Sequence, residues 1–147
     1  MVNETIYWHI IKYMSIDCTH IFSCVIITVM SQIKITLPYP PSVNHYWGQV
    51  GSKKFLGKKG KEFREAVILA VYNARQGALN GRLHMEVYLY PPDKRKRDID
   101  NVLKPLLDAM EHAGCYENDS QIDKLCITRR EVVPQGSCHV EIKVIDS

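Results

Sequence analysis

The strongest constraint on the fold of this 147-residue chain is a strict alternation over residues 83–90. The apolar positions are Leu83, Met85, Val87 and Leu89, and the positions between them are His84, Glu86, Tyr88 and Tyr90. Because successive side chains of a strand point to opposite faces, this period of two predicts a strand with one buried face. Pro91 and Pro92 end it, since proline cannot donate a hydrogen bond to a neighbouring strand. The histidine at 84 is interpreted as an outward-facing strand residue rather than a ligand.

Further elements surround this strand. Apolar residues at helical spacing between Phe63 and Ala74 predict an amphipathic helix that ends near Gly77. A second helix is expected from Leu103 to Met110, with Pro105 in its first turn and Gly114 as its C-terminal cap. The remaining predicted strands cover 33–37, 125–127 and 138–144, and the glycines at 48 and 51 indicate a turn or short hairpin that leads to Phe55 and Leu56.

This order of elements predicts an α+β fold. We expect a single compact domain in which two helices cover a mixed or antiparallel sheet. A length of 147 residues with 46% hydrophobic residues suits one domain with a real core and is too short for two ordinary ones.

Residues 1–30 differ from the rest of the chain. Their apolar stretch at 21–29 is far shorter than the roughly 20 residues that a membrane span needs, and it lacks the features of a signal peptide. The regular pattern begins directly after Met30. We therefore interpret 1–30 as an N-terminal extension, with Met30 as the natural start, and 31–147 as the domain.

Charge is distributed unevenly, although the net charge is only +3. Basic residues gather between Lys53 and Arg64 and again in the run Lys94, Arg95, Lys96 and Arg97. Local basic fields beside acids suit a protein that attracts phosphate and also holds a cation. The five cysteines have no zinc-like spacing, so we expect reduced and mostly buried thiols in a cytoplasmic protein.

Asp98 and Asp100 lie two residues apart, where the loop after the strand leads into the second helix. Two carboxylates so close repel each other unless a cation neutralises them. Carboxylate oxygens suit Mg²⁺ or Mn²⁺, and these ions also accept phosphate oxygens as ligands. Asp119, in the loop after the second helix, supplies a third acid if the chain doubles back. We predict that Asp98, Asp100 and Asp119 bind Mg²⁺, with Mn²⁺ as the alternative.

A purely structural interpretation of these acids stays open. Asp98 or Asp100 would then be a helix N-cap, and Asp119 an ordinary turn residue. The four cations directly before Asp98 favour the functional interpretation, because such a run repels itself on a structural cap but suits phosphate binding beside a metal. Arg95, Lys96 and Arg97 are therefore expected to bind the phosphate backbone.

Lys104 follows Asp100 by four residues, and on a helix the two would share a face. In a phosphodiesterase its ammonium would stabilise the negative charge of the transition state or help to orient the attacking water. The alternative is an exposed salt bridge to Asp100 or Asp108. Tyr46 and Trp47 are candidates for stacking on unpaired bases, although core or dimer contacts are the commoner role of such aromatics.

Several short motifs are combined in this chain. They are Leu37 to Ser42 followed by Asn44; Arg97, Asp98, Ile99, Asp100 and Asn101; Lys104, Asp108 and Ala109; Ala113 and Gly114; and Asn118 to Gln121. With them, the chain from Met30 onward resembles the RusA family of phage and bacterial Holliday junction resolvases. Family metal-binding acids correspond to Asp98, Asp100 and Asp119, and the essential lysine to Lys104. Arg97 and Asn101 fall on positions associated with DNA binding or with support of that site.

The resemblance implies a homodimer that binds a four-way DNA junction and makes paired, metal-dependent nicks that leave ligatable ends, a hydrolase activity of DNA recombination and repair. Two alternatives remain open, namely a non-catalytic DNA-binding domain and a nuclease that acts on other branched DNA. A phosphatase or sugar transferase with an Asp-x-Asp metal site fits less well. Those folds place the pair after a hydrophobic strand of a larger parallel sheet, where this chain has Lys94 to Arg97.

Overall fold

A computed structural model describes residues 32–74 and 77–145. The strands are β1 (Gln32–Pro38), β2 (Trp47–Val50), β3 (Lys53–Leu56), β4 (Arg82–Tyr90), β5 (Ile122–Arg129) and β6 (Ser137–Ile145). The helices are α3 (Val43–Tyr46), α4 (Lys58–Asn73) and α5 (Leu103–His112), with 3₁₀ turns η1 (Asp100–Val102) and η2 (Asp119–Gln121). The predicted N-terminal extension and its proposed start at Met30 lie outside the described residues.

The main sheet is mixed, with the strand order β1-β6-β4-β5. The β1–β6 and β6–β4 pairs are antiparallel, whereas β4 and β5 are parallel. Parallel neighbours need a crossover connection, and η1 and α5 provide it. The prediction of an α+β single domain, with helices covering a mixed or antiparallel sheet, is confirmed, and the sheet is the mixed kind.

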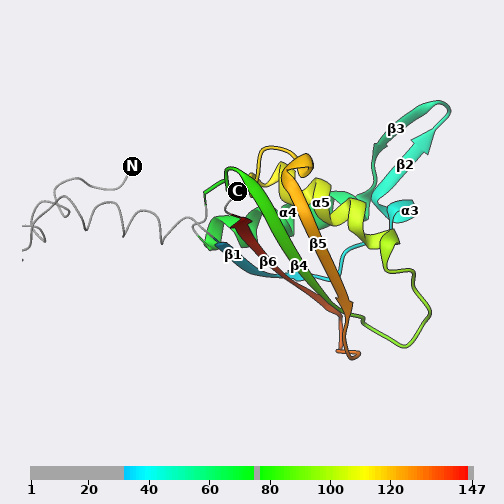
Figure 1. The fold of residues 1–147 in the computed structure, drawn as a ribbon. Helices are drawn as coiled ribbons and strands as arrows, with labels where there is room; N and C mark the ends of the chain where they lie inside the picture. Colours follow the sequence, from blue (N-terminus) through cyan, green and yellow to red (C-terminus); the bar gives the residue numbers. More distant parts are fainter. Residues whose placement is uncertain (1–31, 75–76, 146–147) are drawn as a thin grey trace, which may run out of the picture.

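One face of this sheet forms the core. All four apolar residues predicted to face inward from β4 are at most 1% exposed, and those of β1 and β6 are buried beside them. Helices α4 and α5 pack against each other and cover this face, as Figure 1 shows. The opposite face carries the half-buried histidines 84 and 139, and the ring of His139 lies 4.7 Å from that of Tyr90. The outward-facing placement predicted for His84 is confirmed.

The C-terminus of α5 is closed as the sequence predicts. Gly114 adopts a left-handed conformation, with φ of 78°. Its N–H donates to the carbonyl of Glu111, and the N–H of Cys115 donates to the carbonyl of Met110, which is the bonding pattern of a Schellman cap. Pro105 is the third residue of α5, within the first turn, where its missing N–H breaks no helical hydrogen bond.

Helix α4 begins five residues earlier than its apolar pattern predicts. Lys58, Lys59 and Lys61 are exposed and therefore contribute nothing to an apolar period. The buried residue of this first turn is Gly60, where a Cβ atom would lie 2.5 Å from the carbonyl oxygen of Tyr46. The start of α4 thus depends on close backbone packing, which a hydrophobic pattern does not show. The predicted end near Gly77 was also late, because the helix ends at Asn73.

The second, two-stranded sheet is the hairpin β2–β3, which projects from the body of the domain (Figure 1). This confirms the hairpin expected around Gly48 and Gly51. Within the described ranges, no helix is both long and apolar enough to cross a membrane. Of the cysteines described, Cys115 and Cys138 are buried and Cys126 is exposed. Burial raises the pKa of both buried thiols to about 12, so they stay protonated near neutral pH.

Candidate active site

The crossover from β4 to β5 carries the residues that the sequence singled out. The loop after β4 contains the basic run and Asp98, η1 begins at Asp100, and Lys104 lies in the first turn of α5. Asp119 begins η2, directly before β5. The chain therefore does double back, since α5 runs between Asp100 and Asp119 and η2 returns it to the sheet.

Lys104 connects α5 to η2 by ion pairs. Its Nζ lies 2.8 Å from Oδ1 of Asp108 and 3.2 Å from Oδ2 of Asp119, while its side chain remains 57% exposed. The backbone N–H of Asp119 donates to a carboxylate oxygen of Glu111, at 3.2 Å, and so ties η2 to the same helix. The expected salt bridge from Lys104 to Asp108 is therefore present. Lys104 also lies beside Asp119, one of the acids predicted for the site, so its expected role in that site stays a prediction.

The two ion pairs determine the charge of Lys104. The hydrogen bonds that it donates, first to Asp108 and then to Asp119, raise the pKa of its ammonium group above the ordinary value. A lysine acts as a general base only when its pKa is depressed. Lys104 is consequently a permanent cation near neutral pH, suited to stabilising negative charge rather than to removing a proton.

Asp98 and Asp100 are both exposed, and together they line a shallow depression that also includes Arg97 and Arg129. Within the described residues neither carboxylate has a hydrogen-bond or ion-pair partner. The N-caps of η1 and α5 are Ile99 and Val102, and neither accepts a side-chain hydrogen bond, so neither aspartate caps a helix. The structural interpretation of this pair as a helix N-cap is therefore not what the structure shows.

The three acids predicted as metal ligands are not gathered at one point. Across residues 32–74 and 77–145, no three Asp, Glu, His or Cys side chains are grouped closely enough to hold a metal ion. Asp119 instead pairs with Lys104. The donor chemistry of Asp98 and Asp100 nevertheless fits Mg²⁺, because this ion is commonly held by one or two carboxylates, several waters and the phosphates of a substrate.

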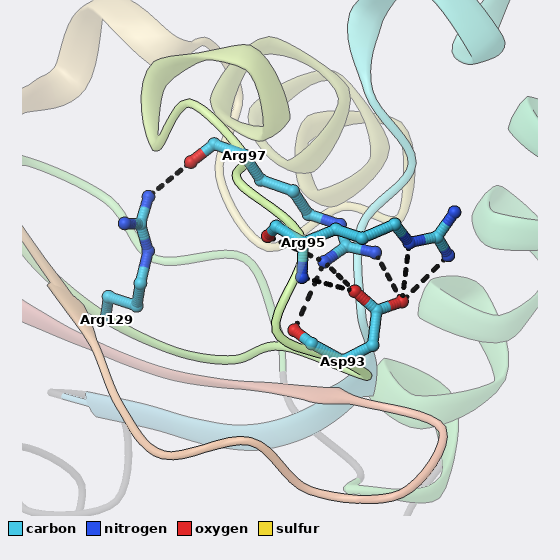
Figure 2. Close-up of polar contacts among 4 residues, drawn as sticks. All are labelled: Asp93, Arg95, Arg97 and Arg129. Carbon is cyan, nitrogen blue, oxygen red and sulfur yellow. Dashed lines mark hydrogen bonds and ion pairs between the residues drawn. The ribbon is translucent and has the colours of Figure 1, made fainter.

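Asp93 organises the basic loop, as Figure 2 shows. Nη1 of Arg97 lies 2.7 Å from its Oδ1 and Nη2 lies 2.8 Å from its Oδ2, a bidentate pair. Nη2 of Arg95 donates to the same Oδ2 at 2.8 Å, and the backbone N–H of Arg95 donates to Oδ1. These hydrogen bonds, with that of Arg97 the largest influence, hold the pKa of Asp93 well below its usual range. From the other side, Arg129 donates to the carbonyl oxygen of Arg97.

These contacts divide the predicted DNA-binding residues. Arg97 is only 23% exposed and its guanidinium lies over the ring of Tyr39, so its visible role is to hold the loop in place. Arg95 is 81% exposed and can reach a phosphate with the part of its fork that Asp93 leaves free. Lys96 is exposed, and Asn101 is half-buried in the same groove as Asp98. The DNA-binding role of all four stays a prediction.

The groove in question joins the two basic regions of the sequence. It runs from the start of α4 to the loop after β4 and is lined by residues that include Tyr39, Ser42, His45, Lys59, Arg95, Arg97, Asp98 and Asn101. Lys59 and Asp98, 39 positions apart in the sequence, thus lie along one surface. A phosphate backbone in this groove would pass between cations on its way to the aspartate pair.

Sequence reasoning missed two acids that the structure places in contact with the candidate site residues. Asp93 precedes a run of cations, and that arrangement was itself a signal of local pairing. Glu111 carried no signal, because its contact with Asp119 arises only when the chain doubles back. Tyr46 is fully buried, with its hydroxyl accepting a hydrogen bond from Arg64, so the commoner of the two roles considered for it, a core contact, is confirmed.

The β4–β5 crossover of this α+β domain carries exposed carboxylates and a cationic lysine, and a basic groove reaches the same loop. These are residues that a phosphodiester-cleaving enzyme needs. Residues 38–145 match the family described as Endodeoxyribonuclease RusA. The chain is 37% identical over 119 residues to the crossover junction endodeoxyribonuclease of Enterobacteria phage HK97, covering 80% of this chain and 99% of that protein. The protein belongs to the RusA endodeoxyribonuclease family.

Bacterial and other phage relatives are more distant. The protein of the same name from Escherichia coli strain K12 is 29% identical over 116 residues, which cover 77% of this chain and 95% of that protein. The one from Enterobacteria phage 82 is 28% identical over 116 residues, with the same shares. The chain thus spans nearly the whole length of each relative.

Proposed function

We propose that this protein resolves Holliday junctions by paired, metal-dependent hydrolysis of phosphodiester bonds. The observation that carries the proposal is the family match over residues 38–145, supported by relatives named crossover junction endodeoxyribonucleases. The exposed carboxylates beside a basic groove provide the chemical reason. The proposed setting is the cytoplasm of a bacterial or phage-infected cell.

Asp98 and Asp100 are the residues that would hold Mg²⁺ or Mn²⁺, since both are exposed and neither is paired within the described part of the chain. A bound divalent cation would supply charge neutralisation for the phosphate and a more acidic water as the nucleophile. Asp119 acts through Lys104 in this arrangement. A role for it as a direct ligand, as in the family, requires that the ion pair with Lys104 give way.

Lys104 stabilises the developing charge. Its ammonium is held by Asp108 at 2.8 Å and by Asp119 at 3.2 Å, which leaves the third of its three hydrogen atoms for an oxygen of the phosphate. A fixed cation that needs no reorientation during the reaction is more effective than one held by water alone. Asp108 and Asp119 are positioning residues in this proposal.

We further propose that the active species is a homodimer. Two symmetry-related cuts in a four-way junction require two active sites related by a two-fold axis, and a two-fold dimer supplies them directly. The junction itself is the substrate, and no small-molecule cofactor is needed beyond the metal ion.

The first test compares wild type with Asp100→Asn on a synthetic four-way junction and a linear duplex, each with and without Mg²⁺. The substitution keeps the shape of the side chain but removes the charge that binds the metal ion. We expect cleavage of the junction to need Mg²⁺ and to fall at least about 1,000-fold in the variant, since metal-assisted charge stabilisation accounts for several kcal/mol. Junction binding without metal should persist.

Asp123→Asn is the matched control, because this carboxylate pairs with Arg82 and is not among the residues proposed for the site. It should cut like wild type. Cleavage by Asp100→Asn at the wild-type rate would remove the site assignment. Wild type that binds junctions but cuts no branched DNA would support a non-catalytic DNA-binding domain, and cleavage confined to forks or flaps would support the nuclease for other branched DNA.

A further inference from the structure

The hairpin β2–β3 joins the domain at its base, where the first residue of β2 and the residue after β3 contact Tyr46. Its cross-strand pairs are Trp47 with Leu56, Gly48 with Phe55, Gln49 with Lys54 and Val50 with Lys53. At the root, the N–H of Gly57 donates to the carbonyl oxygen of the buried Tyr46 at 2.8 Å. The ring of Trp47 packs edge-on against that of Tyr46, with centroids 5.2 Å apart. The tip projects away from the sheet and helices (Figure 1).

Apolar side chains on the projecting part face solvent. Val50 is 71% exposed and Phe55 is 49% exposed. The ring of Phe55 lies against its cross-strand partner Gly48, where a Cβ atom would come within 2.5 Å of Cζ. The far end of the ring is therefore covered by the backbone of Gly48, and about half of the side chain is open to solvent. Single exposed apolar residues are common on protein surfaces, so the exposure of this ring indicates a binding role only if the residues around it support one.

The residues around this ring along the sequence are basic. Lys53 and Lys54 flank the ring in β3, Lys58 and Lys59 follow at the start of α4, and no Asp or Glu occurs between residues 32 and 61. Open aromatic faces among cations are the combination that binds unstacked bases next to their phosphates. A second copy of this chain is a poor occupant, because a two-fold contact between hairpins would bring these lysines against their own copies.

The root of the hairpin also meets the candidate active site. Trp47 and Arg64 line the same depression as Lys104, and the acids Asp108, Glu111 and Glu117 also line it. A strand whose phosphate lies at Lys104 therefore passes the base of the hairpin, and its neighbouring nucleotides come within reach of the projecting part.

We propose that the hairpin is a branch-point arm in which Phe55 stacks on a base that is unstacked at the branch point, while Lys53 and Lys54 hold the adjoining phosphates. This inference rests on the proposed function and adds the element that distinguishes branched DNA from continuous duplex. The arm supplies selectivity, whereas Asp98, Asp100 and Lys104 carry out the reaction.

The test measures binding of the full chain to a four-way junction and to a linear duplex of equal length, in EDTA so that no strand is cut. Phe55→Leu keeps an apolar cover over Gly48 but cannot stack, and Phe55→Trp keeps the stacking surface. We expect Phe55→Leu to weaken junction binding about 5- to 100-fold and duplex binding less than about twofold. Phe55→Trp should stay close to wild type.

A 2-aminopurine base at the branch point provides a second readout. Wild type should change its fluorescence on binding, and Phe55→Leu should reduce that change by at least about half, because the base then has no ring to stack on. Tyr72→Ala is the matched control, since this aromatic residue is 78% exposed on α4 outside the hairpin. It should behave as wild type in both assays.

Three results would overturn the inference. The first is junction binding by Phe55→Leu equal to that of wild type, and the second is an equal loss of affinity for junction and duplex. The third is a lower molar mass of Phe55→Leu than of wild type by light scattering, which would make the hairpin a contact between copies. Cleavage by wild type in Mg²⁺ is measured in parallel. If wild type cuts the junction and Phe55→Leu behaves identically, only the arm is wrong, whereas a wild type that neither binds nor cuts junctions contradicts the proposed function.

Discussion

The two basic stretches of this protein resemble each other in sequence and differ in what their charges do. In the run from Lys94 to Arg97, both arginines are tied to Asp93 and the loop is folded around that carboxylate. In the stretch from Lys53 to Lys61, the only ion pair among the described residues is a 3.9 Å contact between Lys58 and Glu62. Most of the arginine charge in the run from Lys94 to Arg97 is therefore already paired with a carboxylate. Most lysines of the stretch from Lys53 to Lys61 have no such partner among the described residues.

The difference has a chemical cause. A guanidinium group is planar and donates two parallel hydrogen bonds to one carboxylate, so it serves well as a structural clamp. An ammonium group on a flexible chain keeps its hydration and acts as a mobile point charge. We infer that the arginine loop positions Asp98, whereas the lysine stretch attracts DNA.

The largest expected effect comes from removing the centre of the clamp. Asp93→Ala should lower junction cleavage about 100-fold, because a misplacement of about 1 Å in a reacting group costs about that much. Binding should hold or tighten, since two arginines lose their acidic partner. Cleavage rates and hydrogen exchange of residues 91–98 measure both effects. Asp123→Ala removes an equal charge at the sheet edge and should change neither, and unchanged cleavage by Asp93→Ala would break the comparison.

A smaller effect distinguishes the two arginines of the loop. Arg97→Lys loses the bidentate pair of a largely buried side chain, and we expect roughly tenfold slower cleavage with faster exchange in the loop. Arg95→Lys alters an exposed side chain and should cost less than about threefold. If both variants cut equally well, Arg97 has no positioning role that Arg95 lacks.

The lysine stretch is tested by the salt dependence of binding. Lys53→Ala combined with Lys54→Ala should weaken binding to junction and duplex by similar factors, roughly tenfold at low salt. The slope of log K against log salt should become shallower by about 0.9 for each phosphate that the protein no longer neutralises. Lys124→Ala combined with Lys143→Ala, on the open face of the sheet beside His84, is the charge-matched control. An equal change of slope in the control would show only a net-charge effect.

The smallest effect is the response to acid. The pKa of Asp93 is depressed by Arg97 and Arg95, so its contribution to stability is present above its ordinary pKa of 3.8 and is lost as the pH falls through the lower value. The free energy of unfolding of wild type should exceed that of Asp93→Asn at pH 7 and at pH 5 by the same amount. The gap should narrow only below about pH 3.8. Urea unfolding at these pH values measures it, and a gap that closes already at pH 5 would contradict the clamp.

Much of the fold could be predicted because local patterns carry it. The alternation over 83–90 is a property of residues next to each other, and it correctly placed a strand with one buried face. Pro105 and Gly114 placed the ends of α5 because each acts through its own backbone angle. The start of α4 was missed because its buried residue is a glycine packed on a distant carbonyl.

The candidate site was predictable in its residues but not in its contacts. The sequence by itself determined the family, an α+β domain with a mixed or antiparallel sheet, and the nearness of Asp98 to Asp100, since all of these rest on motifs and short spacings. Only the tertiary structure decided that Lys104 pairs with Asp108 and Asp119, that Asp93 engages both arginines, and that Phe55 lies open on a projecting hairpin. Which charges pair and which rings stay exposed depends on segments that meet only after folding.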